Sequence, residues 1–269
     1  MDWASRNSVG DNTTEAAYGN SMRKNYLGIS CDDISIGQAL SFMDSERSRR
    51  FISIVTPNVD HILKLNSSSY EELNTSYSRA TLILNDSRVV KLLSRIFKLG
   101  ITNVVTGSDL VEQMVNRERN QHILLVGPTN RATDKLRLSF PTCTFENICP
   151  DTTALSNIQR HELLELAAQP RFSVILFCMG CPVSEELLSR TADRRTFGIG
   201  ISCGAAVDFL TGKQNRAPKL LQALAMEWLF RAFSQPSRLG KRYLCNLVQL
   251  PVLLSKLIIS QGLYSNQSW

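Results

Sequence analysis

The sequence predicts an α/β fold with a mostly parallel sheet and helices on both of its faces. Short apolar runs alternate with segments of helical period from about residue 25 to residue 210. Helical segments between strands are the right-handed crossovers that join neighbouring parallel strands. The chain of 269 residues is long enough to bury one large core, and no internal repeat is visible. Together these observations favour a Rossmann-like arrangement.

The expected strands are apolar runs rich in Val, Ile, Leu and Phe, as strands buried on both faces require. In chain order they are Tyr26–Ile29, Phe51–Val55, Thr81–Leu84, Asn103–Val105, His122–Val126, Thr142–Asn147, Phe172–Cys178 and Thr196–Ile199. The helices expected between them lie near residues 36–48, 59–66, 69–78, 88–98, 108–118, 130–139, 157–168 and 183–192.

The two ends of the chain differ from this α/β region. Residues 1–24 are polar and lack apolar periodicity, so we expect a poorly ordered leader. They also lack the apolar central run of a secretory signal peptide, which argues against export. We therefore expect an α/β catalytic domain over residues 25–212 and a helical appendage over residues 213–269.

Polar residues follow several expected strands at the edge where α/β folds bind ligands. These loops are Thr56-Pro57-Asn58, Asn85-Asp86-Ser87, Thr106-Gly107-Ser108-Asp109, Gly127-Pro128-Thr129 and Gly180-Cys181-Pro182, with Glu185 shortly after the last. The same residue types make turns and cap helices, so each loop alone also has a structural explanation. Five such loops at one sheet edge nevertheless predict a cleft.

The positive charge of the chain is concentrated in one segment near the C-terminus. Its basic residues are Lys213, Arg216, Lys219, Arg231, Arg238, Lys241 and Arg242, and its one acid is Glu227. This segment therefore carries a net charge of +6, which equals the formal charge of the whole chain. Such a patch indicates a phosphate-bearing partner, in a nucleotide, a nucleic acid or a lipid headgroup. A solvated helix face is the alternative.

The appendage is expected to contain helical segments over Ala217–Phe233 and Leu239–Ile259. The part from residue 244 to residue 259 is apolar but is interrupted by Asn246, Gln249, Pro251 and Lys256. It is too short and too broken to span a bilayer. Apolar residues after a basic cluster are typical of a helix that lies in the membrane interface. Packing on the domain or on another subunit remains an open alternative.

Seven cysteines are scattered along the chain, an odd number that fits reduced thiols in a cytoplasmic protein better than a disulfide framework. Cys178 and Cys181 form a C-x-x-C pair, but no second pair completes a zinc site.

Two other classes of protein fit the sequence less well. Gly198, Gly200 and Gly204 resemble a dinucleotide-binding loop, but they lie at the end of the expected sheet instead of opening it. A dinucleotide-dependent oxidoreductase is therefore disfavoured. No nucleic-acid motif and no interleaving of aromatic with basic residues is visible, so we expect no nucleic-acid partner.

Several segments together resemble one family of bacterial glycosyltransferases, over about Leu27 to Tyr243. The matching residues are Gly204-Ala205-Ala206-Val207-Asp208-Phe209, Gly212, Arg216-Ala217-Pro218, Glu227-Trp228-Leu229-Phe230-Arg231, Pro236, Arg238 and Arg242-Tyr243. Upstream, Thr56-Pro57-Asn58, Gly107-Ser108-Asp109 and Gly180-Cys181-Pro182-Val183-Ser184-Glu185 match further motifs. This is the pattern of the WecG/TagA/CpsF family, glycosyltransferase family 26. Two residues depart from it, since Ser87 stands where the family has Gly and Ser184 where it has Gln.

The resemblance implies an inverting transfer of a hexose or an N-acetylhexosamine-type sugar from a UDP-sugar to a polyprenyl-diphosphate-linked acceptor. It places the enzyme peripherally on the cytoplasmic face of the cell membrane, and it leaves homo-oligomer formation open. The family needs no metal bound by a D-x-D motif, and no D-x-D occurs in this sequence. We therefore expect no metal ion and no cofactor. The alternative function is a non-catalytic scaffold of a polysaccharide assembly complex, suggested by the two departures.

The resemblance also assigns roles to particular residues. Asp86 matches the catalytic aspartate, which would take the proton of the acceptor hydroxyl, although capping a helix is its structural alternative. The expected substrate-binding residues are Thr56, Asn58, Gly107, Ser108, Asp109, Gly127, Gly180, Pro182 and Glu185. Arg231, Arg238 and Arg242 are expected to bind the diphosphate, because guanidinium groups match phosphate oxygens well.

Overall fold

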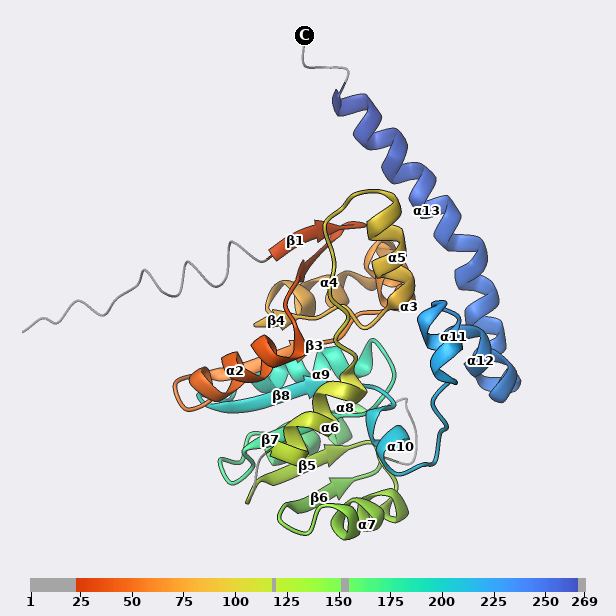
Figure 1. Ribbon diagram of the computed structural model, residues 1–269. Coiled ribbons are helices and arrows are strands. Elements are labelled where there is room, and N and C mark those ends of the chain that lie inside the picture. The colour runs from red at the N-terminus through yellow and green to blue at the C-terminus, as the bar shows by residue number, and fades with distance from the viewer. Residues whose placement is uncertain (1–22, 118–119, 151–154, 266–269) are drawn as a thin grey trace, which may run out of the picture.

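A computed structural model describes residues 23–117, 120–150 and 155–265, apart from the side chains of Arg238 and of residues 257–265 (Figure 1). Its centre is a six-stranded sheet in the order β4-β3-β8-β7-β5-β6. Every pairing in this sheet is parallel. The strands are β3 (Phe51–Val55), β4 (Leu82–Ile83), β5 (His122–Val126), β6 (Thr144–Ile148), β7 (Val174–Phe177) and β8 (Gly198–Ser202). The predicted Rossmann-like α/β fold is confirmed.

Helices cover both faces of the sheet, as side chains that alternate between the two faces require. In β5, Leu124 and Val126 belong to one buried cluster, whereas Ile123 and Leu125 belong to the other. The first face carries α3 (Val59–Leu65), α4 (Glu71–Ser78), α8 (Asn157–Ala167) and α9 (Val183–Ala192). The second carries α2 (Ile36–Glu46), α6 (Gly107–Arg117), α7 (Asn130–Ser139) and α10 (Ala206–Leu210), while α5 (Arg88–Ile96) follows the edge strand β4.

The single strand predicted over Tyr26–Ile29 is wrong, because these residues form the turn of a hairpin. Strands β1 (Arg23–Tyr26) and β2 (Ile29–Asp32) pair in antiparallel fashion. Leu27 has a φ of 46° and Gly28 a φ of 81°, and positive φ at both turn residues is what a tight two-residue hairpin needs. The Asp32 carboxylate accepts the Ile83 backbone N–H at 2.8 Å, so the hairpin covers the exposed edge of β4.

The strand predicted over Asn103–Val105 is also wrong. Asp33 Oδ1 accepts the backbone N–H of Asn103 at 2.8 Å, and the Val105 N–H donates to the carbonyl of Asn85 at 2.8 Å. The backbone N–H groups of this segment therefore donate to a side chain and to a loop carbonyl instead of to a neighbouring strand. It leads into α6 without joining the sheet.

The last strand runs over Gly198–Ser202, later than the predicted Thr196–Ile199. Its glycines explain why the apolar pattern there is weak. A Cβ atom at Gly200 would lie 2.5 Å from Leu188 Cδ1 and 2.7 Å from Phe51 Cζ, so a larger residue would force these two buried side chains to move.

The C-terminal region is helical, as predicted, but its first helical segment is divided. Ala225 has a φ of 57° and separates α11 (Lys219–Ala223) from α12 (Glu227–Ser234). A π-helical turn (Pro236–Gly240) then leads into α13 (Lys241–Ser265), which packs beside α3. The boundary expected at residue 213 stays a prediction.

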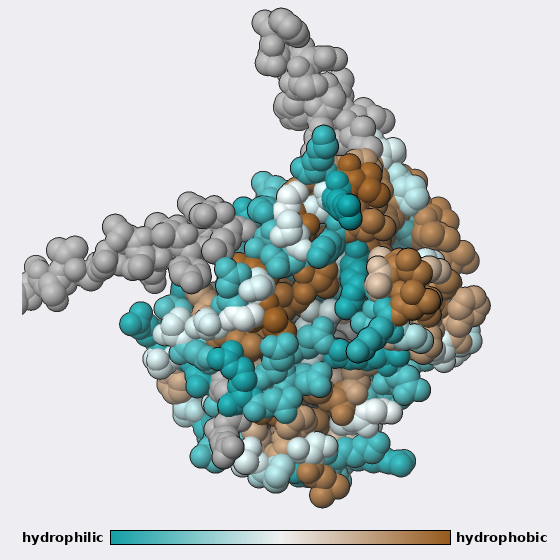
Figure 2. Space-filling view, viewed as in Figure 1, coloured by the Kyte–Doolittle hydropathy of each residue, from teal (hydrophilic) through white to brown (hydrophobic). Residues whose placement is uncertain are grey.

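Large apolar side chains are exposed on these C-terminal helices, where Figure 2 shows a hydrophobic surface beside the more polar α/β region. On α13, Leu244, Val248 and Val252 follow one another at four-residue spacing and are 65%, 64% and 50% exposed. Within the described residues, no helix is both long enough and apolar enough to cross a membrane.

Candidate active site

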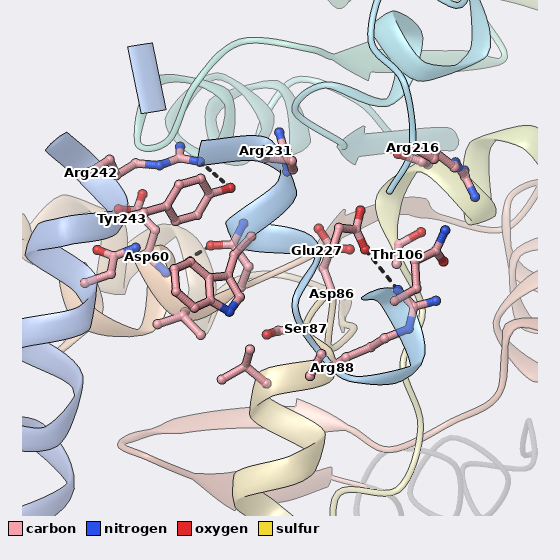
Figure 3. Close-up of a pocket in the computed structure, with 18 of the residues that line it drawn as sticks. Asp60, Asp86, Ser87, Arg88, Thr106, Arg216, Glu227, Arg231, Arg242 and Tyr243 are labelled. Atoms are coloured by element: carbon pink, nitrogen blue, oxygen red, sulfur yellow. Dashed lines mark hydrogen bonds and ion pairs between the residues drawn. The ribbon is translucent and has the colours of Figure 1, made fainter. Parts of the chain in front are cut away.

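A pocket opens where the carboxyl ends of β3 and β4 face the C-terminal helices (Figure 3). One wall comes from the loops after β3 and β4 and from the start of α6: Asn58, Val59, Asp60, Asp86, Ser87, Arg88, Val89, Thr106, Ser108 and Asp109. The other wall comes from residues 209–250: Phe209, Arg216, Gln222, Ala225, Glu227, Trp228, Arg231, Arg242, Tyr243, Asn246, Leu247 and Leu250. The pocket therefore joins two parts of the chain that are distant in sequence.

Asp86 lies in this pocket with a carboxylate that accepts no hydrogen bond from any described residue. The helix that follows is capped by its neighbour, because Ser87 Oγ accepts the Val90 backbone N–H at 3.2 Å. Burial, followed by the negative charge of Glu227, raises the pKa of Asp86 well above its ordinary value. The positive charge of Arg231 acts in the opposite direction but offsets only part of this rise. A carboxyl group whose pKa is raised in this way is a candidate for proton transfer in catalysis.

Two arginines in the pocket form no ion pair at contact distance within the described residues, although the charge of Arg231 acts on Asp86. The buried Nε atoms of Arg231 and Arg242 lack a hydrogen-bond partner there. The Arg231 guanidinium lies 5.3 Å from the centre of the Phe209 ring, and that of Arg242 lies 5.1 Å from the centre of the Tyr243 ring. Uncompensated guanidinium groups that are packed on aromatic rings favour an anionic ligand.

The other pocket arginines are neutralised by carboxylates. Arg88 Nη1 lies 3.0 Å from Glu227 Oε2, and Arg216 pairs with Asp109. Both pairs join the α/β region to the C-terminal region, and Figure 3 shows the pair of Arg88 with Glu227. They hold the two walls together and leave Arg231 and Arg242 as the free positive charges of the pocket among the residues described.

Three of the predicted substrate-binding residues line the pocket: Asn58, Ser108 and Asp109. Asn58 also caps α3, with its Oδ1 accepting the Asp60 N–H at 3.0 Å. Two others lie directly beneath. The buried Thr56 hydroxyl donates to the carbonyl of Ser202 at 3.0 Å. A Cβ atom at Gly107 would come within 3.1 Å of that hydroxyl, so this glycine lets α6 pack closely.

The remaining predicted residues lie outside this pocket: Gly127, Gly180, Pro182 and Glu185. Glu185 is only 3% exposed, and its Oε1 accepts the Ser202 hydroxyl at 2.8 Å and lies 3.3 Å from His61 Nε2. Burial alone would raise the pKa of Glu185, but the hydrogen bonds from His61 and Ser202 outweigh it and lower that pKa. Substrate contacts by these residues stay predictions. The side chain of Arg238 lies outside the described part of the chain.

His61, Cys181 and Glu185 offer ligand atoms that lie within 4.8 Å of one another, as a metal site would. The Asn58 backbone N–H donates to His61 Nδ1 at 3.3 Å, so the imidazole proton sits on Nε2 and faces Glu185. The Lys64 ammonium donates to the Cys181 carbonyl at 3.0 Å and pairs with the Asp60 carboxylate at 3.0 Å. The His61 ring and Glu185 Oε1 therefore already bond protein groups, whereas Glu185 Oε2 is buried without a partner among the described residues.

Ser184, one of the two departures noted in the sequence, points into the protein. Its hydroxyl accepts the Met179 backbone N–H at 3.0 Å and donates to the carbonyl of the same residue at 2.9 Å. The side chain is completely buried, so it stabilises the loop after β7 and does not face the pocket.

Sequence reasoning gave no binding or catalytic role to several residues that line the pocket. Glu227, Trp228 and Tyr243 belong to the quoted motif, and the rings of Trp228 and Tyr243 lie 6.1 Å apart. Arg88 had no signal beyond its place at the start of a predicted helix. Leu247 and Leu250 were interpreted only as part of an apolar helix.

A comparison with protein-family models supports the resemblance. The model of the glycosyl transferase WecG/TagA/CpsF family matches residues 24–265, which is nearly the whole chain.

Proposed function

The chain belongs to the WecG/TagA/CpsF glycosyltransferase family, and from this premise we propose a specific reaction for its pocket. Membership makes the protein a glycosyltransferase of cell-surface polysaccharide synthesis. The proposed reaction moves a hexose or an N-acetylhexosamine-type sugar from a UDP-sugar to a polyprenyl-diphosphate-linked acceptor. It proceeds with inversion at the anomeric carbon and uses no metal ion.

One observation carries this proposal: the pocket holds a carboxylate of raised pKa together with two guanidinium groups that no described acid neutralises. A sugar transfer needs both, because the acceptor hydroxyl must lose a proton while the donor releases a diphosphate.

In the proposed step, Asp86 accepts the proton of the acceptor hydroxyl as its oxygen attacks the anomeric carbon of the donor. The bond between that carbon and the donor phosphate oxygen breaks, and its electron pair leaves with UDP. Arg231 and Arg242 stabilise the negative charge that develops on the diphosphate. Attack on the face opposite the leaving group inverts the anomeric centre.

The C-terminal helices support a peripheral place on the cytoplasmic face of the membrane. Exposed apolar side chains on α12 and α13, such as Phe233 and Val248, accompany the basic residues of the same region. An apolar face with basic neighbours binds to the headgroup region of an anionic bilayer. This orientation brings the pocket close to lipid-linked acceptors.

The direct test is transfer from a panel of UDP-sugars to a short-chain polyprenyl-diphosphate sugar, with wild-type protein compared with Asp86→Asn. We expect transfer from one donor class and a loss of about 10²- to 10⁴-fold in the variant, while UDP binding persists. Asp134→Asn, an exposed aspartate on α7, is the matched control and should act like wild type.

Transfer that survives Asp86→Asn would remove Asp86 as the base. UDP binding without transfer from any donor would instead favour the scaffold function. Stereochemical analysis of the product tests inversion, and full activity in the presence of a chelator tests independence from metal ions.

A further inference from the structure

Helix α5 carries a surface that combines positive charge with exposed apolar side chains, and it belongs to the α/β region instead of the C-terminal region. Leu92 and Ile96 on this helix are 47% and 61% exposed, and Phe97 directly after it is 37% exposed. Residues 88–98 contain four basic residues and no acid. The sign of the charge is therefore the same along the whole helix.

The two kinds of side chain form separate rows on α5. Leu92 and Ile96 are four residues apart, and so are Lys91 and Arg95, so each pair shares one face of the helix. Val90 is 1% exposed and holds the opposite face against the core. A cationic row beside an apolar row, both exposed to solvent, is the pattern of a helix that lies in the interface of a bilayer.

The positive charges of this surface are available to a partner. Lys91, Arg95 and Lys98 are exposed, and no ion pair joins any of them to an acid in the part of the chain that the structure describes. Arg88, at the start of the same helix, differs because Glu227 neutralises it. Unpaired cations beside a membrane attract its anionic lipid headgroups.

The small size of the apolar surface favours a bilayer over a protein partner. Three partly exposed side chains cover far less than the area of about 800 Å² that each partner buries in a standard protein interface. Shallow insertion into the headgroup region needs only a small apolar face when cations accompany it.

The place of α5 in the molecule agrees with such a contact. Val89 in its first turn and Leu247 of α13 both line the pocket, so the two helices meet there. Helix α7 lies at the other end of the molecule (Figure 1). The pocket thus opens between two helices that each expose apolar side chains.

We propose that α5 is a membrane contact of the α/β region, in which Leu92 and Ile96 enter the headgroup region while Lys91, Arg95 and Lys98 bind anionic lipid headgroups. This contact goes beyond the proposed function, which assigns membrane binding to the C-terminal helices, and rests on it only for the location at a membrane. Two contacts, one from each region, fix the orientation of the pocket relative to the bilayer, whereas one helix alone allows rotation about its axis.

Hydrogen–deuterium exchange of the full chain tests the contact directly, because it reports α5 and the C-terminal helices separately. The probes are vesicles of phosphatidylcholine with and without phosphatidylglycerol. With the anionic vesicles, residues 88–98 should exchange at least about threefold more slowly than in free protein. Vesicles of phosphatidylcholine alone should give much weaker protection of the same residues, and added salt should reduce the protection by anionic vesicles.

Substitutions on α5 should weaken sedimentation with the anionic vesicles. A variant that combines Lys91→Gln, Arg95→Gln and Lys98→Gln should bind about 10- to 100-fold more weakly. A variant that combines Leu92→Ser and Ile96→Ser should bind about tenfold more weakly. Urea unfolding should give both variants nearly the wild-type midpoint, since exposed side chains contribute little to stability.

Helix α7 supplies matched controls of both kinds. Arg131 is an exposed arginine there, and Leu138 is an 83% exposed leucine. Arg131→Gln and Leu138→Ser should each bind the anionic vesicles like wild type.

Protection confined to the C-terminal helices, or wild-type binding by both α5 variants, would overturn the contact. Protection of α5 that rises with protein concentration in the absence of vesicles would overturn it in favour of a second copy of the chain. Failure of the proposed function is distinguishable. Protection of α5 without sugar transfer keeps the contact and rejects the reaction, whereas transfer to a short-chain acceptor without protection of α5 keeps the reaction and rejects the contact.

Discussion

Asp86 and Glu185 follow strands of the same sheet at the same edge, yet their surroundings have opposite effects. Asp86 receives no hydrogen bond from the described residues, and burial with a neighbouring carboxylate raises its pKa. Glu185 is more deeply enclosed, but hydrogen bonds from His61 and Ser202 lower its pKa. The difference shows that donors directed at the carboxylate, and not burial alone, decide which form of a buried acid is stable.

The two regions also differ in where their partners come from. Glu185 Oε1 is bonded by residues of β8 and α3, within the α/β region itself, while its buried Oε2 has no partner among the described residues. Asp86 meets the charges of Glu227 and Arg231, which α12 brings from a distant part of the chain. Both regions therefore keep buried polar atoms without a partner, but only the Asp86 region combines a carboxylate that receives no hydrogen bond with guanidinium groups whose Nε atoms lack a partner among the described residues. Retained unpaired groups are typical of sites that bind and transform a ligand.

After the loss of activity expected for Asp86→Asn, the largest effect is expected from removing an unpaired positive charge in the Asp86 region. Arg231→Gln should lower kcat/KM for the UDP-sugar about 10- to 100-fold, because a charge-assisted contact to phosphate is lost. Arg216→Gln, which removes an arginine already paired with Asp109, should cost markedly less. Steady-state kinetics of the two variants tests this prediction. Equal losses of kcat/KM would show that an unpaired arginine matters no more than a paired one.

In the Glu185 region the expected effect is on stability. Glu185→Gln should lower the free energy of unfolding at neutral pH by about 1–3 kcal/mol, because it weakens the buried bonds to His61 and Ser202. The folded-state pKa of Glu185 is lowered, so its contribution exists above the unfolded-state pKa and disappears as the pH falls through the folded-state pKa. Urea unfolding at neutral and acidic pH measures the difference in the free energy of unfolding between wild type and Glu185→Gln. A difference that stays the same in acid would contradict this prediction.

Asp86→Asn should have the opposite sign and a smaller size, a gain of roughly 0.5–1 kcal/mol at neutral pH. The folded-state pKa of Asp86 is raised, so ionisation of this carboxyl destabilises the fold as the pH rises above the unfolded-state pKa. The neutral amide avoids that loss, and the gain should vanish in acid. Urea unfolding at neutral pH should therefore show a higher free energy of unfolding for Asp86→Asn and a lower one for Glu185→Gln. A lower value for both variants would contradict the contrast between the two carboxyl groups.

The smallest effect concerns the pH dependence of turnover. Glu227 raises the pKa of Asp86, so Glu227→Gln should move the acidic limb of the kcat/KM profile to lower pH, by less than about one pH unit. Glu112→Gln is a suitable control, because Glu112 contacts Arg216 at 3.6 Å outside the pocket lining. A limb that stays in place, or moves to higher pH, would show that Glu227 does not act on the base.

The sheet was predictable where an uninterrupted apolar run fills a strand. His122–Val126 is such a run, and the structure has the same bounds. Tyr26–Ile29 has a similar composition, but the positive φ of Gly28 makes it a turn, which apolar content does not reveal. The weak apolar signal of the last strand has the opposite cause, since Gly200 lacks a side chain and leaves room for those of Leu188 and Phe51.

The site was predictable in part, because loops after parallel strands lie at one edge. Sequence reasoning expected five such loops to converge, but β8 and β7 separate β3 from β5, and the C-terminal helices face only the side near β3 and β4. The partners of Asp86 carry no local signal. Arg88 and Glu227 are separated by 139 positions, and only the folded chain shows that they pair.

The two ion pairs that join the walls of the pocket, Arg88 with Glu227 and Arg216 with Asp109, have a thermodynamic consequence. A ligand that touches both walls stabilises their association by mass action, and the association in turn tightens binding by the same free energy. Exposed ion pairs weaken as salt screens them, so occupancy of the pocket and attachment of the C-terminal helices should decline together as ionic strength rises. Bound ligand would then hold the C-terminal helices against the α/β region, and proteases should cut the linker around residues 213–218 more slowly while the pocket is filled.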